Sequence, residues 1–257
     1  MPNAWNAGSA VLFEQAGFEA FATTSAGMAY AHAVPDSAGE LGFDRALLET
    51  AEMATAVDIP LSMDAENFYA ETLEEVKPNL QHIFTTGVVG ANIEDFTGKR
   101  EQPLYDFELA VERVQAAVET ISELDYPFTL CARTDCFLVG HEDAMNESIR
   151  RLSRYREAGA DCLYAPGLRD LESIKTLVKE VDGPVNVVMG LSGTPIALDE
   201  LRQAGVARIS IGGSLARACF GLVRRAAREM LEQGSFDYAQ QQIADGELGK
   251  LFRDRLK

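Results

Sequence analysis

The sequence predicts an α/β fold, a single eightfold β/α barrel of the TIM type. The chain has 257 residues, the usual length of one such barrel. Short β-rich runs alternate with longer runs of helical periodicity along the whole chain. Eight such units, without hairpin signals, favour a closed parallel barrel over an open doubly wound sheet. The open sheet would carry a G-x-G-x-x-G turn after its first strand, and the sequence has none there.

Each expected strand is a short apolar run, and each is followed by an amphipathic stretch. We expect strands at 3–5, 18–23, 60–66, 88–95, 128–135, 162–166, 185–189 and 208–211. We expect helices at 8–16, 44–56, 72–86, 106–124, 142–158, 170–181, 197–204 and 214–232. No linker interrupts this series, so residues 1–257 are predicted to form one domain. Residues 234–257 mix polar and apolar side chains in helical fashion and are predicted to form a helical tail.

Composition and charge restrict the partners of the chain. The net charge of −17 disfavours binding to phosphate backbones and anionic lipids, so we expect neither nucleic acid nor membrane partners. No apolar run is long enough to span a bilayer. Residues 1–5 lack the basic and apolar regions of a secretory signal, which predicts a cytoplasmic protein. The four cysteines form no C-x-x-C pair and are expected to be reduced and structural.

Acidic residues end the third and fourth predicted strands. Because side chains alternate along a strand, Asp64 and Glu66 share one face of the third strand, and Glu94 lies on the corresponding face of the fourth. Thr129, Cys131, Arg133 and Asp135 share one face of the fifth strand in the same way. The C-terminal ends of barrel strands form the active-site face. Three carboxylates gathered there repel one another unless a cation lies between them, and oxygen ligands suit Mg²⁺, with Mn²⁺ as an alternative. A buried salt-bridge network around Arg133 is the other interpretation.

Several motifs occur in an order that resembles the isocitrate lyase/phosphoenolpyruvate mutase superfamily, over essentially the whole chain. They are Asn3-Ala-Trp-Asn-Ala-Gly-Ser9, Ala22-Thr-Thr-Ser-Ala-Gly27, Pro35-Asp36, Met63-Asp-Ala-Glu66, Asn92-Ile-Glu-Asp95, Pro103-Leu-Tyr-Asp106, Ala132-Arg-Thr-Asp135 and Gly212-Gly-Ser-Leu-Ala-Arg217. The combination in this order is specific, although no single motif is.

The resemblance implies a Mg²⁺-dependent lyase that breaks a C–C or P–C bond in a small 2-oxo or 2-hydroxy carboxylate through a metal-stabilised enolate. It implies that the metal is held by Asp64, Glu66 and Glu94. It implies catalytic roles for Arg133, Asp36 and Ser25, and it assigns substrate binding to Ser25, Ala26, Gly27, Arg133 and Asn186. It also implies a homo-oligomer, either a dimer or a tetramer.

Two departures from the family pattern bear on the reaction. Isocitrate-type lyases carry a Lys-Lys-Cys-Gly-His or Lys-Arg-Cys-Gly-His segment after the fourth strand, whereas residues 96–103 here contain no cysteine or histidine. The chain therefore resembles a short branch close to phosphoenolpyruvate mutase. The Gly-Tyr-Gly or Gly-Phe-Gly that usually follows the second metal-site acid is replaced by Asn67-Phe68-Tyr69-Ala70, which adds bulk near the mouth.

Other functions stay open at this point. The altered residues 67–70 and the missing catalytic loop are also compatible with a carboxylate-binding barrel that does no chemistry. Activities of the oxaloacetate decarboxylase or phosphonopyruvate hydrolase kind are further alternatives. A phosphosugar enzyme would use the backbone N–H groups of residues 212–214 to bind phosphate, although the same glycines also permit a tight turn.

Overall fold

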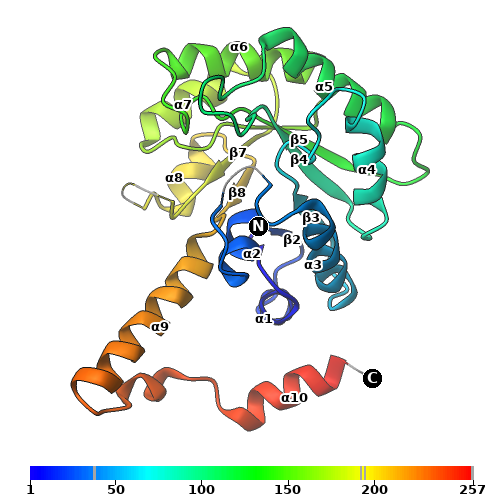
Figure 1. Ribbon diagram of the computed structural model, residues 1–257. Coiled ribbons are helices and arrows are strands. Elements are labelled where there is room, and N and C mark those ends of the chain that lie inside the picture. Colours follow the sequence, from blue (N-terminus) through cyan, green and yellow to red (C-terminus); the bar gives the residue numbers. More distant parts are fainter. Residues whose placement is uncertain (37–38, 192, 194, 256–257) are drawn as a thin grey trace.

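The computed structural model describes residues 1–36, 39–191, 193 and 195–255, and it confirms the predicted barrel (Figure 1). Eight parallel strands follow one another around the barrel in sequence order, each hydrogen-bonded to the next. The strands are β1 Asn3–Ala4, β2 Phe21–Thr23, β3 Leu61–Asp64, β4 Gly90–Glu94, β5 Thr129–Arg133, β6 Cys162–Tyr164, β7 Val185–Val188 and β8 Arg208–Ser210.

A side chain, rather than a strand ladder, joins the two ends of the sheet. Among the described residues no ladder pair links β1 to β8. Asn3 bridges them instead, because its Oδ1 accepts hydrogen bonds from the N–H groups of Ile211 (2.9 Å) and Gly212 (3.0 Å). Its Nδ2 donates to the carbonyl of Thr23 on β2 (2.7 Å), which fixes the amide orientation. The terminal amino group adds a bond to the Ile209 carbonyl (2.8 Å).

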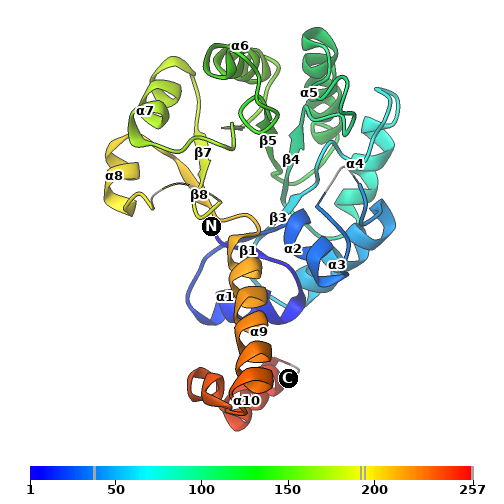
Figure 2. The same cartoon turned by 60° about the vertical axis from the view of Figure 1, so that its left-hand side comes forward.

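Helices alternate with the strands and surround them (Figure 2). They are α1 Ala7–Gln15, α2 Ser25–Ala31, α3 Phe43–Thr55, α4 Val76–Phe84, α5 Phe107–Ile121, α6 Ala144–Glu157, α7 Leu171–Glu180, α8 Leu198–Gln203, α9 Ser214–Glu232, the 3₁₀ turn η1 Asp237–Gln241 and α10 Asp245–Arg255. Helix α2 is not among the helices expected from the sequence. It begins at the N-cap Thr24, whose hydroxyl accepts from Gly27 N.

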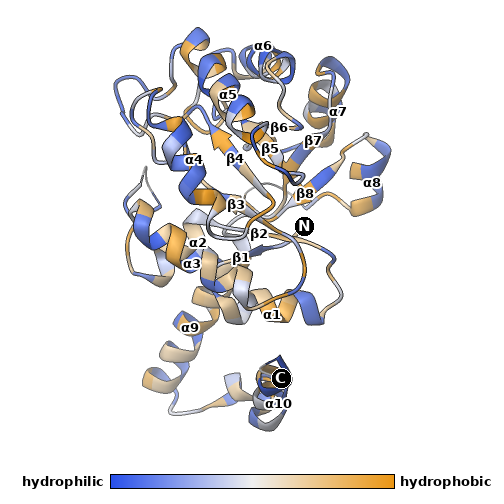
Figure 3. Ribbon diagram, turned by 90° about the vertical axis from the view of Figure 1, so that its right-hand side faces the viewer, coloured by the Kyte–Doolittle hydropathy of each residue, from blue (hydrophilic) through white to orange (hydrophobic). Residues whose placement is uncertain are grey.

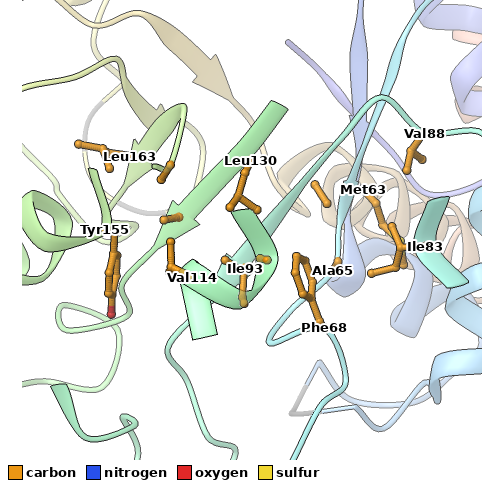
Figure 4. Packing of buried hydrophobic residues seen from close by; sticks show 14 of the residues in the cluster. Met63, Ala65, Phe68, Ile83, Val88, Ile93, Val114, Leu130, Tyr155 and Leu163 are labelled. Carbon is orange, nitrogen blue, oxygen red and sulfur yellow. The ribbon is translucent and has the colours of Figure 1, made fainter. Parts of the chain in front are cut away.

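The core lies between the strands and the helices that cover them. Met63, Ile93 and Leu130 point outward from their strands, and Ile83 of α4 and Val114 of α5 pack in the same layer (Figure 4). All five are buried. Hydrophilic and hydrophobic residues alternate along the covering helices (Figure 3), as expected for helices with one face on a core. The polar face of each strand therefore points into the barrel interior.

The predicted helical tail is confirmed through residue 255, and residues 256 and 257 lie outside the described part of the chain. Helix α9 extends away from the barrel, and α10 returns toward α1 (Figure 1). Arg255 of α10 forms an ion pair with Glu14 of α1, and Phe252 packs against the core. No described helix is both long and apolar enough to cross a membrane.

Candidate metal and substrate site

A cavity of about 300 Å³ opens at the C-terminal ends of the strands and continues into the barrel. It is lined by inward residues of all eight strands or of the turns that follow them. Asp64, Glu66, Glu94 and Arg133 all line it, so the convergence expected from strand periodicity is observed. No cysteine or histidine is among the described residues that line it.

Asp64, the last residue of β3, is oriented by the start of α2. Its Oδ2 accepts hydrogen bonds from the backbone N–H (3.0 Å) and the hydroxyl (2.9 Å) of Ser25. Ser25 is the first helical residue of α2, where N–H groups have no partner within the helix. The Asp64 N–H in turn donates to the Thr23 hydroxyl (2.8 Å). The two bonds from Ser25 engage Oδ2 of Asp64, whereas Oδ1 lies 3.8 Å from Arg133 Nη1.

Glu66 lies just beyond β3, where the backbone turns into the left-handed region at φ +50°. Its Oε2 accepts from Gly39 N (2.8 Å) and its Oε1 from the Tyr69 hydroxyl (3.0 Å). Burial raises the pKa of Glu66 to about 7, against the opposing effect of the Gly39 N–H. Tyr69 has φ +52° and stacks on Phe43, with ring centroids 5.1 Å apart. The residue that replaces a family glycine therefore supports the Glu66 carboxylate.

Glu94 and Arg133 form the centre of the site. Arg133 donates through Nε (2.6 Å) and Nη2 (2.9 Å) to the two carboxylate oxygens of Asp135. Its Nη1 lies 2.8 Å from Glu94 Oε2. Burial raises the pKa of Glu94 well above its ordinary value even though Arg133 lowers it, and nearby carboxylates add to the increase. Burial alone would lower the pKa of Arg133, but Asp135 and Glu94 raise it, so the guanidinium stays charged.

A buried network behind the cavity holds Asp135. The Asp135 N–H donates to Asp95 Oδ1 (2.9 Å). Asp95 Oδ2 accepts from the Thr134 hydroxyl (2.7 Å), the Tyr155 hydroxyl (2.8 Å) and Arg151 Nη1 (3.1 Å). The buried salt-bridge network around Arg133, which was the other interpretation of the sequence, is therefore present. It does not neutralise the cavity, because the carboxylates outnumber the guanidinium groups there.

The charge balance of the cavity fits a divalent cation. Five carboxylate side chains and two guanidinium groups are among the described residues that line it. The buried Glu94 Oε2 is ion-paired with Arg133 Nη1 at 2.8 Å and meets no hydrogen-bond geometry within the described part of the chain. In the same part, no three His, Cys, Asp or Glu side chains are close enough to ligate one ion directly. Mg²⁺ is usually bound through one or two carboxylates and several retained waters, so the donors present suit this ion.

The other residues implied by the resemblance lie at different depths of the cavity. Ser25 and Ala26 line it near the mouth, and Gly27 is buried behind them in α2. Asp36 lines the mouth from an exposed loop, and its pKa is raised by partial desolvation and by the Asp64 carboxylate. Asn186 of β7 is buried, donates to the Ser210 hydroxyl (3.0 Å) and accepts from Arg208 Nε (3.0 Å). Its amide is committed to barrel neighbours rather than free.

The sequence assigned no role to three further residues of the cavity. Asp135 lies two residues after Arg133, just beyond the end of β5, and alternation along the longer predicted strand puts both on one face. Asn92 and Tyr164 also face inward from β4 and β6 and line the cavity. A polar or aromatic residue on an inward face occurs in many barrel interiors, so nothing in the sequence distinguished these two.

The raised pKa of Glu66 predicts a pH dependence of stability. Without metal, the folded protein holds a proton on Glu66 between pH 4.5 and 7 that the unfolded chain releases. The contribution of Glu66 to the free energy of unfolding should therefore fall as pH rises through this window, by roughly 3 kcal/mol at most, and then level off above pH 7. Urea unfolding at pH 5 and pH 8 measures the fall. The Glu66→Gln protein should show a smaller fall, because it keeps only the part due to other raised carboxyl groups such as Glu94; an identical fall in both proteins would contradict the assignment.

Gly27 sits where α2 approaches β1 and α9 most closely. An added Cβ would lie 2.5 Å from Thr24 Cγ2 and 2.8 Å from Trp5 Cβ. Gly27→Ala is therefore expected to destabilise the protein by about 1–3 kcal/mol through overpacking, and to move Ser25 off Asp64. Thermal unfolding tests this. Gly221→Ala in α9, whose Cβ would meet only the mobile end of Arg225, is the matched control and should be neutral or stabilising.

Comparisons with known proteins agree with this geometry. The family model described as phosphoenolpyruvate phosphomutase matches residues 1–231. A 2-methylisocitrate lyase of Escherichia coli K12 is 27% identical over 210 residues, which are 79% of this chain and 69% of the lyase. A provisionally named lyase/mutase of Burkholderia cenocepacia J2315 superposes with a TM-score of 0.94 at 42% identity, over 98% of this chain and 89% of the other. A phosphonopyruvate hydrolase in complex with oxalate and Mg²⁺ superposes with a TM-score of 0.86 at 25% identity, over 99% and 90%.

Proposed function

The chain belongs to the phosphoenolpyruvate phosphomutase family, and from that premise we propose that it is a Mg²⁺-dependent lyase-type enzyme. It breaks a C–C or P–C bond next to a carbonyl group in a small 2-oxo or 2-hydroxy carboxylate. The observation that carries the proposal is the arrangement around Arg133. This guanidinium is fixed by Asp135 on one side and faces Glu94 and Asp64 on the other. The named relatives include a lyase and a hydrolase whose complex contains oxalate and Mg²⁺.

In this proposal the acidic side of the cavity holds the cation, with Mn²⁺ as a substitute for Mg²⁺. Asp64, Glu66 and Glu94 provide the oxygen donors, several of them through water. A bound divalent cation would supply Lewis-acid stabilisation of an enolate oxygen. Ser25 keeps Asp64 in its orientation through two hydrogen bonds. Asp36, on the loop at the mouth, and Ala26, in the first turn of α2, line the cavity where substrate would enter, and Gly27 lets that turn pack closely behind them.

Arg133 is the residue that stabilises the developing negative charge. Breaking a bond next to a carbonyl leaves an enolate, and a fixed guanidinium lowers the energy of that state without having to reorient. The bidentate bond to Asp135 supplies this rigidity. Because no described cysteine or histidine lines the cavity, the proton chemistry differs from that of isocitrate-type lyases.

A direct test is turnover of oxaloacetate, 2,3-dimethylmalate and phosphonopyruvate, each with Mg²⁺ and with EDTA. Metal-dependent conversion of one of these compounds supports the proposal and identifies the bond that breaks. Tight, metal-dependent binding of oxalate without turnover of any substrate would instead support the carboxylate-binding alternative.

The surface of α9 supports a homo-oligomer, which we propose as part of the same function. Along this projecting helix, six large apolar side chains are exposed, and Leu231 is 87% accessible. They are Leu215, Phe220, Leu222, Val223, Met230 and Leu231. Apolar surface of this extent is typical of a protein interface. Sedimentation at micromolar concentration is expected to show a dimer or tetramer, and Val223→Glu together with Leu231→Glu should lower the mass. A monomeric wild-type protein would reject the interface.

A further inference from the structure

Two cysteines lie side by side in the barrel interior, on adjacent strands. Cys131 of β5 and Cys162 of β6 are register partners, so their Cα atoms face each other across one strand spacing. Because side chains alternate along a strand, the two thiols share the inward faces of Arg133 and Tyr164, which both line the cavity. Arg133 and Tyr164 are also register partners. The thiols therefore lie directly below this pair, toward the N-terminal ends of the strands.

A hydrogen bond joins the two thiols, which are both buried and free. The Cys162 S–H donates to the sulfur of Cys131, which lowers the pKa of Cys131 to about 7 against the opposing effect of burial. The pKa of Cys162 is raised by the same bond and by burial, so this thiol stays protonated at neutral pH. The Cys131 sulfur is therefore a thiolate in a substantial fraction of the molecules, and the thiolate is the reactive form of cysteine.

Arg208 of β8 supplies positive charge beside the pair. Its guanidinium donates a hydrogen bond to the Cys131 sulfur, and its Nε donates to Asn186 Oδ1 (3.0 Å). Burial alone would lower the pKa of Arg208, but the Cys131 and Cys162 sulfurs raise it, so the guanidinium stays charged. Arg208 lines the cavity, which therefore extends to a residue in contact with Cys131. This contact gives a small oxidant a route to a thiol that is itself fully buried.

We propose that Cys131 and Cys162 form a redox-sensitive site that hydrogen peroxide oxidises to a reversible disulfide. The Cys131 thiolate attacks one peroxide oxygen, so that an S–O bond forms and the O–O bond breaks. The hydroxide that leaves takes up the proton that Cys131 had released. The Cys162 sulfur then attacks the Cys131 sulfur, an S–S bond forms, the S–O bond breaks, and a second water leaves with the Cys162 proton. In all, the two thiols lose two electrons and one peroxide molecule becomes two waters.

The strand geometry indicates that this disulfide would be strained and therefore reversible. Neighbouring strands lie about 4.8 Å apart, whereas most disulfides join Cα atoms about 5.5–6 Å apart. A strained disulfide is more easily reduced, which suits a reversible modification rather than a permanent crosslink. Closing the bond moves both side chains directly below Arg133, so we expect the guanidinium to shift and to bind anionic ligands less tightly. The disulfide itself goes beyond the proposed function, since it can form whether or not the protein turns over a substrate.

Mass spectrometry of the full chain tests the site, after brief treatment with hydrogen peroxide and alkylation of the remaining thiols. Trypsin cleaves after Arg133, which separates Cys131 from Cys136. The expected product is a disulfide between the peptides that contain Cys131 and Cys162, and dithiothreitol should remove it. In the Cys162→Ala protein, the reaction should stop at a sulfenic acid on Cys131, which dimedone traps. Cys219→Ala is the matched control, because Cys219 is exposed on α9, and it should form the same disulfide.

The effect on the cavity is measured by calorimetry of oxalate binding in the presence of Mg²⁺. Oxidation of the wild-type protein is expected to raise the Kd for oxalate about tenfold, or about 1.4 kcal/mol, and dithiothreitol should reverse the change. The oxidised Cys219→Ala protein should show the same increase. The Cys162→Ala protein cannot form the disulfide, so its Kd after oxidation should rise less. An unchanged Kd in the oxidised wild-type protein would overturn the link between the disulfide and Arg133.

Three outcomes overturn the site itself. They are retention of all four free thiols, oxidation confined to Cys136 or Cys219, and irreversible oxidation of Cys131 without a disulfide. The wild-type protein alone decides among these, so the result does not depend on the folding of a variant. Turnover of a substrate without the disulfide keeps the proposed function and rejects the site. A disulfide in a protein that turns over no substrate keeps the site and rejects the lyase.

Discussion

Replacement of Asp64 by asparagine is expected to lower Mg²⁺-dependent turnover on the order of a thousandfold and to weaken Mg²⁺ binding. Asparagine retains an acceptor for the Ser25 hydroxyl, so α2 should stay in place. The substitution removes the negative charge of the Asp64 carboxylate at the end of β3. The oxygen Oδ1 of this carboxylate accepts no hydrogen bond from Ser25. Steady-state kinetics across a Mg²⁺ titration, with calorimetry of Mg²⁺ binding, separates the loss of metal from the loss of rate.

Asp125→Asn is the control for the loss of one negative charge from an already acidic protein. Asp125 lies on an exposed loop before β5, so this variant should match the wild type in both measurements. An Asp64→Asn protein with unchanged Mg²⁺ affinity and rate would mean that the metal binds elsewhere, and the assignment of Glu66 and Glu94 would fall with it.

Replacement of Arg133 by glutamine should affect both catalysis and stability. The variant loses the bidentate bond to Asp135 and the ion pair with Glu94, whose carboxylates are buried, while the Arg133 side chain is 16% exposed. Removal of one member of a buried charge cluster costs about 3–5 kcal/mol, because the remaining charges have no partner. The rate should fall by about 10²–10³, the range for loss of one fixed donor at an oxyanion. Urea unfolding and kcat/KM measure the two effects.

The origin of the instability can be checked by a second substitution. Asp135→Asn added to Arg133→Gln removes one of the stranded charges and should restore part of the stability but none of the activity. Arg150→Gln is the surface control, since Arg150 is exposed and its partner Glu147 lies on the same helix. It should change stability by about 1 kcal/mol or less. If Arg133→Gln is no less stable than this control, Arg133 does not compensate the buried carboxylates.

The barrel could be predicted because its signals are periodic and local. Each strand has an outward apolar face and each covering helix an amphipathic one, and both patterns are visible in the sequence. Helix α2 was missed because its seven residues follow β2 directly and include Gly27, which has a low helix propensity. The predicted helix at 72–86 was too long at its start. There Glu75 Oε2 accepts from the N–H groups of Glu71 and Thr72, which form a turn before α4.

The inward orientation of a site residue could be predicted where that residue lies within a strand. Asp64, Glu94 and Arg133 lie within strands, so period two put them on the inward face. Glu66 lies beyond the end of β3, in a left-handed conformation, and its support by Tyr69 depends on backbone geometry that no pattern encodes. The family membership expected from the motifs is confirmed. The roles of individual site residues stay predictions until the variants above are measured.

The bridge made by Asn3 also has a consequence for folding. Its bonds to Ile211 and Gly212 join residues 208 and 209 positions apart in sequence, among the most distant hydrogen bonds in the molecule. The chain entropy lost on closing so long a loop is recovered only after the intervening β/α units have formed. We therefore expect closure between β1 and β8 to be a late event in folding. Because the cavity is lined by residues from both sides of this seam, a binding-competent site would form only when the whole barrel has closed.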